Sequence, residues 1–405
     1  MKSFGRVAVA LGLVAGLAGS ALTTAGAKTQ SNPLKGTGEG LKLIRNVAWE
    51  GGTDMEFATI KGRDYAFAGS MAPIMKGGGF HVVDVTNPAK AKQVAWLKCF
   101  ANQGDVQLSH DKKTALFALN NAGGPDSCLA VGKAGFLTID IRNPKKPKNI
   151  GFAAAGTSHN VTAHPKKPIV YVSSSALAGA PFFSVWSIKN PAKPTFIKNV
   201  DSLPHAPHDI SFNKQGTMAV TAAISHWDIF DTRDPANPKL LWTGQCPGCS
   251  ITHDAKWTPD GKHILVGDEA GGGGTFPCPG GALYFYDVNG TETQPVPVLT
   301  GVYETGAVIF PEGTTTGSCT SHVMTVSPDG KRLAISWYDQ GTRYLDISKA
   351  IGATFGENRT PEGIREIGWF IPEKGNSWSS KFHKGQYIYS NDRVRGLDVY
   401  KITAK

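Results

Sequence analysis

Four histidines recur at one position of a repeated sequence pattern. Each stands at the start of a short alternating strand that leads into a turn, as in "ITHDAKWTPDGKHILVGDE", and the four are His159, His208, His253 and His322. Neutral imidazole is the side chain that proteins most often use to bind a metal. Three or four imidazoles gathered at one place would form a copper or zinc site, and an open coordination position there would permit chemistry. The sequence alone fixes no cofactor.

Acidic groups and further imidazoles accompany this histidine column. Asp209 and Asp254 directly follow two of its members, and a carboxylate in that position could orient an imidazole that binds a metal. His205, His226 and Glu269 stand in loops that should open on the same face of the molecule, where they would contact a ligand.

A structural role for the histidines stays open. Side chains alternate between the two faces of a strand, and apolar residues such as Ile210 and Phe212 follow His208 at intervals of two. By this parity the histidines belong to the packed face and would only hydrogen-bond neighbouring loops. The opposite parity carries side chains suited to a wet channel, namely Glu56, Gln107, Thr162, Ser211, Lys256 and Thr325.

The strands that position these residues are copies of one module. A strand ending in Asp is followed by a turn with Asn-Pro or a variant, as in "GGFHVVDVTNPAKA" from Gly78 and "AGFLTIDIRNPKKP" from Ala134. That Asp should cap the turn by accepting backbone N–H groups. Seven copies occur at intervals of roughly 45–60 residues, the range of propeller blades. The prediction is an all-β fold, a seven-bladed β-propeller with four-stranded blades.

A segment near the N-terminus resembles the strand that the last copy of the repeat lacks. The last copy, "GLDVYKI" from Gly396, has no fourth strand behind it, and the segment from Lys42 to Trp49 resembles the fourth strands of other copies. We therefore expect the N-terminal strand to pair with the last blade and close the ring, which removes an exposed sheet edge. The expected organisation is a signal peptide at 1–27, a flexible segment at 28–40 and one propeller at 41–405.

The N-terminus has the pattern of an export signal. Lys2 and Arg6 precede an apolar run, and Ala25-Gly26-Ala27 offers small residues for cleavage. The run is short for a membrane-spanning helix, and a retained anchor is the alternative. We expect a secreted or other extracytoplasmic protein of the cell envelope, without stable membrane insertion after cleavage.

Cysteine usage agrees with export. An even number of cysteines in an exported chain favours disulfides, and this chain has Cys99, Cys128, Cys246, Cys249, Cys278 and Cys319. We predict a Cys99–Cys128 bond and two bonds among the other four. The alternatives are thiolate ligands for copper, or a redox-active or metal-binding pair in "CPGC" at Cys246 to Cys249.

The net charge of the chain and the placement of its lysines indicate which partners to expect. The chain has 42 Lys and Arg against 32 Asp and Glu, a formal net charge of +10, and its lysines are scattered through turns. Nucleic acid is not an expected partner, because no basic stripe with interleaved aromatic residues occurs. A small molecule or a protein is expected on the loop-rich face, and no oligomeric state follows from the sequence.

Two family resemblances can be stated from these residues. The strands "FHVVDV" and "FLTIDI" with their Asn-Pro turns resemble the LVIVD-repeat family of exported bacterial propellers. Pro207–Gln245 is similar to one blade of the selenium-binding protein family, through Pro207-His208-Asp209-Ile210, His226 and Asp234-Pro235. The first resemblance implies the propeller fold. The second implies a copper-dependent methanethiol oxidase, which some members of that family are.

Three functions are therefore expected. The leading one is an exported binding or scaffold module with a ligand or metal site on the loop-rich face at the central channel. Catalysis is not part of that expectation, and no catalytic residue is assigned. The alternatives are a copper-dependent oxidoreductase of small sulfur compounds and a purely structural protein of the cell envelope.

Overall fold

The computed structural model describes most of the chain. The described residues are 34–120, 122–123, 128, 133–156, 158–174, 182–201, 203–278, 280–304, 316–350 and 364–404. The expected signal peptide at 1–27 and residues 28–33 of the segment at 28–40 lie outside these ranges. Within them, no helix combines the length and apolar character needed to cross a membrane.

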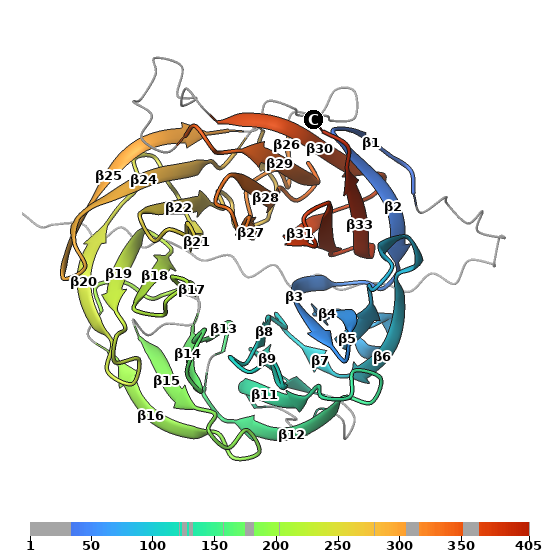
Figure 1. The fold of residues 1–405 in the computed structure, drawn as a ribbon, viewed down its shortest axis with the longest axis horizontal. Helices are drawn as coiled ribbons and strands as arrows, with labels where there is room; N and C mark the ends of the chain where they lie inside the picture. The colour runs from blue at the N-terminus through green and yellow to red at the C-terminus, as the bar shows by residue number, and fades with distance from the viewer. Residues whose placement is uncertain are drawn as a thin grey trace, which may run out of the picture. The chain divides into compact units, whose positions relative to one another are not determined.

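Seven antiparallel sheets of at least four strands surround a central axis (Figure 1). This confirms the predicted seven-bladed propeller. Listed from the inner to the outer strand, blades one to three are β3 (Gly52–Ile60), β4 (Arg63–Ser70), β5 (Gly79–Asp84), β6 (Lys92–Lys98); β8 (Val106–Leu108), β9 (Thr114–Leu119), β11 (Gly135–Asp140), β12 (Lys148–Ala153); and β13 (Asn160–Ala163), β14 (Ile169–Ser173), β15 (Phe183–Ser187), β16 (Thr195–Val200).

The remaining blades follow the same order. They are β17 (Asp209–Phe212), β18 (Met218–Ala223), β19 (His226–Asp231), β20 (Lys239–Gly244); β21 (Thr252–Trp257), β22 (His263–Asp268), β24 (Leu283–Thr291), β25 (Gln294–Tyr303); β27 (Met324–Val326), β28 (Arg332–Ser336), β29 (Thr342–Asp346), β30 (Arg365–Pro372); and β31 (Ser377–His383), β32 (Tyr387–Asp392), β33 (Gly396–Ile402), β2 (Leu41–Val47).

Short strands and turns lie in the loops between these strands. Two small sheets pair β7 (Phe100–Ala101) with β10 (Ala122–Gly123), and β23 (Phe276–Pro277) with β26 (Thr316–Gly317). The loops of blade one also contain two short 3₁₀ turns, η1 (Ile74–Lys76) and η2 (Pro88–Lys90).

Burial follows the position of a strand within its blade. The middle strands β9 and β18 are buried along their whole length, because a neighbouring blade covers each face. The outer strand β16 is exposed over nearly all its length. Asp140 and Asp231, at the ends of third strands, each accept the N–H of the arginine two residues later at 3.0 Å. The predicted capping of the turns is therefore confirmed.

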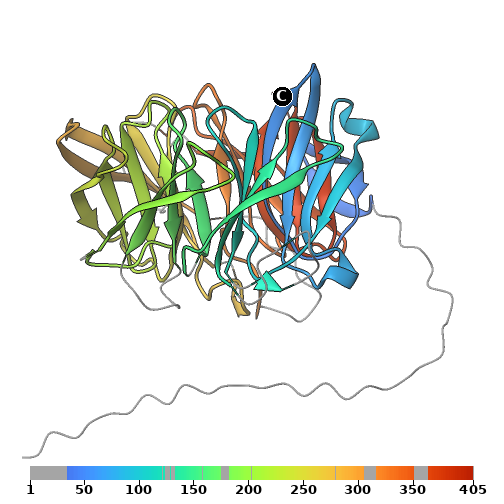
Figure 2. The same cartoon turned by 90° about the horizontal axis from the view of Figure 1, so that it is seen from below.

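The N-terminal strand closes the ring as predicted. β2 pairs antiparallel with β33, in a register that runs from Leu41 opposite Ile402 to Val47 opposite Leu397 (Figure 1). Part of the segment expected to be flexible also forms a strand, β1 (Gly36–Glu39), which adds a fifth strand to blade six by pairing with β30. Figure 2 shows the blue N-terminal strands beside the red C-terminal blade in the edge-on view.

All six cysteines are paired. The bonds are Cys99–Cys128, Cys246–Cys249 and Cys278–Cys319. This confirms the predicted first bond and the prediction of two bonds among the other four. No free thiolate is left to bind copper. Three disulfides suggest an oxidising compartment.

The Cys246–Cys249 bond should add less stability than the Cys99–Cys128 bond. It joins cysteines only 3 positions apart, and a short closed loop removes little entropy from the unfolded chain. We expect the double change Cys246→Ser, Cys249→Ser to lower the free energy of unfolding by about 2 kcal/mol, measured by denaturant titration. The matched change at Cys99 and Cys128, which are 29 positions apart, should cost more. Equal costs would contradict the entropic account.

Candidate metal centre

The histidine column forms a continuous arc at the starts of the innermost strands. Ring centroids lie 4.3 Å apart between His159 and His208, 4.3 Å between His208 and His253, and 4.1 Å between His253 and His322. Trp378 of blade seven extends the arc at 4.2 Å from His322. Equivalent positions in successive blades are thus neighbours in space, as the propeller prediction required.

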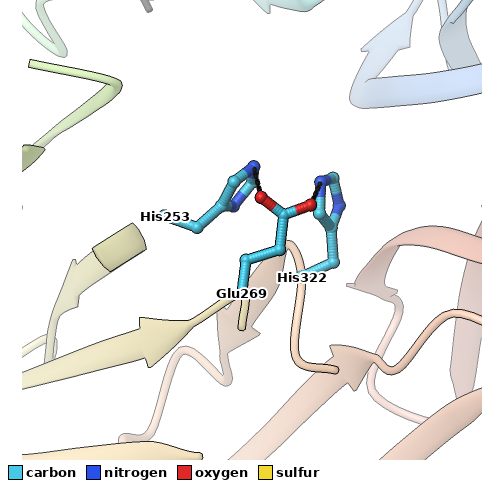
Figure 3. Close-up of side chains that lie close together, drawn as sticks. All are labelled: His253, Glu269 and His322. Carbon is cyan, nitrogen blue, oxygen red and sulfur yellow. Dashed lines mark ion pairs between the residues drawn. The ribbon is translucent and has the colours of Figure 1, made fainter. Parts of the chain in front are cut away.

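Two of these histidines meet a carboxylate from the neighbouring loop. Glu269 Oε2 lies 3.6 Å from His253 Nε2, and Glu269 Oε1 lies 3.7 Å from His322 Nε2. Figure 3 shows the carboxylate between the two rings. Among the described residues, this is where three potential ligand atoms come within 4.8 Å of one another. Metal bonds of about 2.0–2.2 Å leave the ligands of one ion about 3–4 Å apart. The group could therefore hold a metal ion.

A backbone carbonyl orients the His322 ring. His322 Nδ1 lies 2.6 Å from the carbonyl oxygen of Trp378, and a carbonyl oxygen can only accept a hydrogen bond. The proton is therefore assigned to Nδ1, and Nε2 presents a lone pair towards Glu269. Nε2 is buried and has no hydrogen-bond partner within the described part of the chain. Such fixing of one ring nitrogen is typical of histidines that bind a metal through the other.

The four rings are neutral near pH 7. Burial lowers the pKa of His208 to about 4 and that of His322 to about 3. Burial also holds the pKa values of His159 and His253 well below the usual histidine range, and nearby imidazoles add to the effect. Neutral imidazole is the form that binds metals.

Burial and neighbouring groups shift the pKa of Glu269 in opposite directions. Burial raises its pKa to about 7, although the Tyr338 hydroxyl and the charge of Arg393 act in the opposite direction. The Tyr338 hydroxyl donates a hydrogen bond to Glu269 Oε1. A cation between the carboxylate and the imidazoles would favour the ionised form of Glu269.

The glycine-rich loop after β22 places Glu269. The Glu269 N–H donates to the carbonyl oxygen of Ile251 at 2.8 Å, which fixes the start of the loop. Gly273 has φ of +70°, and a Cβ there would lie 2.6 Å from the Tyr338 hydroxyl oxygen. Glycine at this position lets the loop cover the Glu269–Tyr338 hydrogen bond.

The three clustered residues line a cavity of about 300 Å³. Its apolar lining residues include Met71, Ile224 and Ile251, and its polar lining residues include Gln103 and Arg393. The remaining lining residues are His159, His208, His253, Glu269, Gly272, His322, Tyr338 and Trp378. All four histidines of the column thus line one cavity. Two of them, His253 and His322, lie close enough to Glu269 to bind one metal ion together with it.

The comparisons with known proteins support the fold alone. No family model and no curated protein matches the chain. The β-propeller domain of Cps50 (Swd1) from Myceliophteria thermophila is similar at a TM-score of 0.62 and 11% identity, over 90% of this chain and 100% of that chain. A functionally unknown protein from Desulfotomaculum acetoxidans is similar at a TM-score of 0.51 and 16% identity, over 78% and 88% of the two chains. These likenesses assign no family.

Sequence reasoning named Glu269 but missed the other members of a second column that lines this cavity. Its members stand one or two residues after the second strand of a blade, and they are Met71, Ile224, Glu269, Tyr338 and Arg393. Aligning the ends of the second strands, in addition to the starts of the first, would have found Tyr338 and Arg393. Ile224 has φ of 61° and Tyr338 has φ of 42°. Such conformations cost about 1–3 kcal/mol in side chains of this kind and cluster at functional sites.

His205 and His226 lie apart from this cavity. Their rings stack on each other at blade four, with centroids 3.3 Å apart and an interplanar angle of 7°. The hydroxyl of Ser225 lies 2.9 Å from His226 Nδ1. Neither histidine is among the residues that line the cavity.

Asp209 and Asp254 lie beside Lys256. Lys256 Nζ lies 2.6 Å from Asp254 Oδ1 and 3.5 Å from Asp209 Oδ2. No hydrogen bond joins either carboxylate to an imidazole of the column in the described residues. The orienting role expected of them falls, for His322, to the Trp378 carbonyl.

A second, more polar cavity of about 550 Å³ occupies the channel. Its lining includes all six residues that strand parity assigned to a wet channel, Glu56, Gln107, Thr162, Ser211, Lys256 and Thr325. The parity prediction is therefore confirmed for the channel wall.

Proposed function

We propose that the chain is an extracytoplasmic β-propeller that binds a transition-metal ion, zinc or copper, and presents it to a ligand in the adjoining cavity. The observation that carries this proposal is the buried group of His253, Glu269 and His322, in which His322 Nε2 has no hydrogen-bond partner among the described residues. Two imidazoles and a carboxylate are a donor set of catalytic zinc sites, and they leave a coordination position open. His208, next along the arc, is the nearest further imidazole.

The free-energy cost of burying these side chains without a cation between them supports the proposal. His322 Nε2 and the Glu269 carboxylate are both acceptors, they face each other at 3.7 Å, and both side chains are largely removed from water. The Tyr338 hydroxyl donates to the carboxylate, but His322 Nε2 has no donor among the described residues, and a buried acceptor without a donor is unfavourable. A cation between the two groups would satisfy His322 Nε2 and balance the carboxylate charge.

Metal titration tests the proposal. We expect wild-type protein, after chelator treatment, to bind one equivalent of Zn²⁺ or Cu²⁺ in calorimetric titration. The double variant His253→Ala, His322→Ala should bind at least about 100-fold more weakly, because two ligands are lost. His164→Gln is the matched control, since His164 is also buried but hydrogen-bonds Gly216 elsewhere. Wild-type protein that takes up no stoichiometric metal would overturn the proposal.

Copper-dependent oxidation of small sulfur compounds is the second candidate. It is favoured by the similarity of Pro207–Gln245 to a blade of the selenium-binding protein family, because His208 of that segment lines the cavity. Copper-loaded protein would then consume methanethiol and oxygen, and His208→Ala would abolish the consumption. The LVIVD-repeat resemblance supports export and a propeller fold, and it favours neither candidate.

A further inference from the structure

The cavity beside the metal group contains one cationic side chain. Arg393 follows β32 directly, and its guanidinium carbon lies 5.4 Å from the centre of the Trp378 ring. Arg393 lines the same cavity as His253, Glu269 and His322. The positive charge of Arg393 also lowers the pKa of Glu269, so the guanidinium acts electrostatically on that carboxylate.

The guanidinium of Arg393 has no acidic partner among the described residues. The nearby Arg395 differs, because its Nε lies 2.8 Å from Asp398 Oδ2. The backbone of Arg393 is nevertheless fixed, since its N–H donates to Asn376 and its carbonyl accepts from Gly51. Two backbone hydrogen bonds therefore position a planar, bidentate donor that is exposed to solvent and lines the cavity. Arginine is the side chain best suited to recognising carboxylates in this way.

The other lining residues define the rest of the ligand. Met71, Ile224 and Ile251 are apolar, and Trp378 adds an aromatic surface. A cavity of about 300 Å³ is at the small end of ligand pockets and suits a molecule of few atoms. It thus combines a cationic end, an apolar wall and the metal group.

We infer that the cavity binds a small organic carboxylate with an apolar body, whose carboxylate pairs with Arg393. The body packs against the apolar lining residues Met71, Ile224 and Ile251, close to the metal group. This names the ligand class of the proposed metal site, and only the proximity to a metal rests on the proposed function. The pairing with Arg393 stands on the chain's own residues.

Calorimetry with hexanoate and its uncharged analogue hexanamide tests the inference. Wild-type protein should bind hexanoate at least about 10-fold more tightly than hexanamide, because only the carboxylate pairs with the guanidinium. Arg393→Gln should remove that preference and leave hexanamide binding unchanged. Arg393→Lys should restore part of it, since lysine keeps the charge but loses the bidentate geometry. Arg365→Gln, an exposed arginine outside the cavity, is the control and should behave as wild type.

The titrations are made on metal-free and on zinc-loaded protein. Hexanoate affinity that depends on Arg393 supports the inference. This result can be obtained on metal-free protein alone, so it stands even if no metal binds and the proposed function fails. Equal hexanoate affinity in wild type and Arg393→Gln overturns the inference and leaves the metal proposal intact. Absence of hexanoate binding in both forms also overturns it.

Discussion

Removal of residues 1–47 is expected to abolish the folded monomer. This truncation deletes β2 and leaves the edge of β33 unpaired, and unpaired strand edges promote association with other chains. It also removes Leu41, Leu43 and Val47, which are buried against the last blades. Burial of each such side chain contributes about 1.5–3 kcal/mol, and the whole stability of a domain is about 5–15 kcal/mol. Circular dichroism and size-exclusion chromatography of the truncated chain measure the effect.

Two further truncations separate ring closure from a general effect of shortening. A chain that begins at residue 34 keeps β1 and β2 and should unfold at the same temperature as the full chain. A chain that begins at residue 41 keeps β2 and loses only β1, whose four residues are all exposed, so the loss of stability should be small. A peptide covering 34–48 should restore folding of the 48–405 chain. A stable monomer of 48–405 without the peptide would contradict ring closure.

The repeat explains how far the sequence could predict this fold. The Asp that ends a third strand caps its turn locally, so each copy marks its own blade, as at Asp140 and Asp231. The unpaired strand from Lys42 and the incomplete copy at Gly396 then define the closure. Because blades are related by rotation, a position that recurs along the sequence becomes a ring of neighbours in space. The histidine arc could be predicted for that reason.

The ligand group itself could not be predicted in full. Strand parity placed the histidines on the packed face, yet His159 and His208 precede the first residues of β13 and β17, where alternation no longer applies. They are buried and still line a cavity. Glu269 was expected to contact a ligand, but its distance to His253 and His322 depends on how the glycine-rich loop folds over Tyr338. Spacing along the sequence contains no information on that loop.

Replacing Lys256 with methionine should lower the free energy of unfolding by about 3–5 kcal/mol at pH 7, the usual cost of removing one partner of a buried ion pair. Lys256 Nζ lies 2.6 Å from Asp254 Oδ1 and 2.8 Å from the Ser211 hydroxyl, and the Asp254 side chain is completely buried. Burial by itself lowers the pKa of Lys256, and the carboxylates of Asp254 and Asp209 outweigh it, so that this pKa lies above its usual value. Without the ammonium group, the Asp254 carboxylate would remain buried with the Met324 N–H as a donor but with no cation beside it.

The cost of Lys256→Met should fall as the pH is lowered from 7 to about 4. Burial already raises the pKa of Asp209 to about 7, and loss of the neighbouring cation raises it further. A carboxyl whose pKa is raised by folding stabilises the fold fully below its unfolded pKa of about 3.9, and that contribution is lost as the pH rises through the folded pKa. The Asp209 carboxyl of the variant, protonated at low pH, therefore costs least there.

Denaturant titrations at pH 7 and pH 5 measure this dependence. Lys262→Met, in an exposed turn after the same strand, is the matched control and should change stability by less than about 0.5 kcal/mol at either pH. Lys256→Arg keeps the charge and should cost less than Lys256→Met. A loss below about 1 kcal/mol at pH 7, or an equal loss at both pH values, would mean that water in the channel solvates the carboxylates. The lysine would then contribute to the charge balance of the channel and not to the stability of the ring.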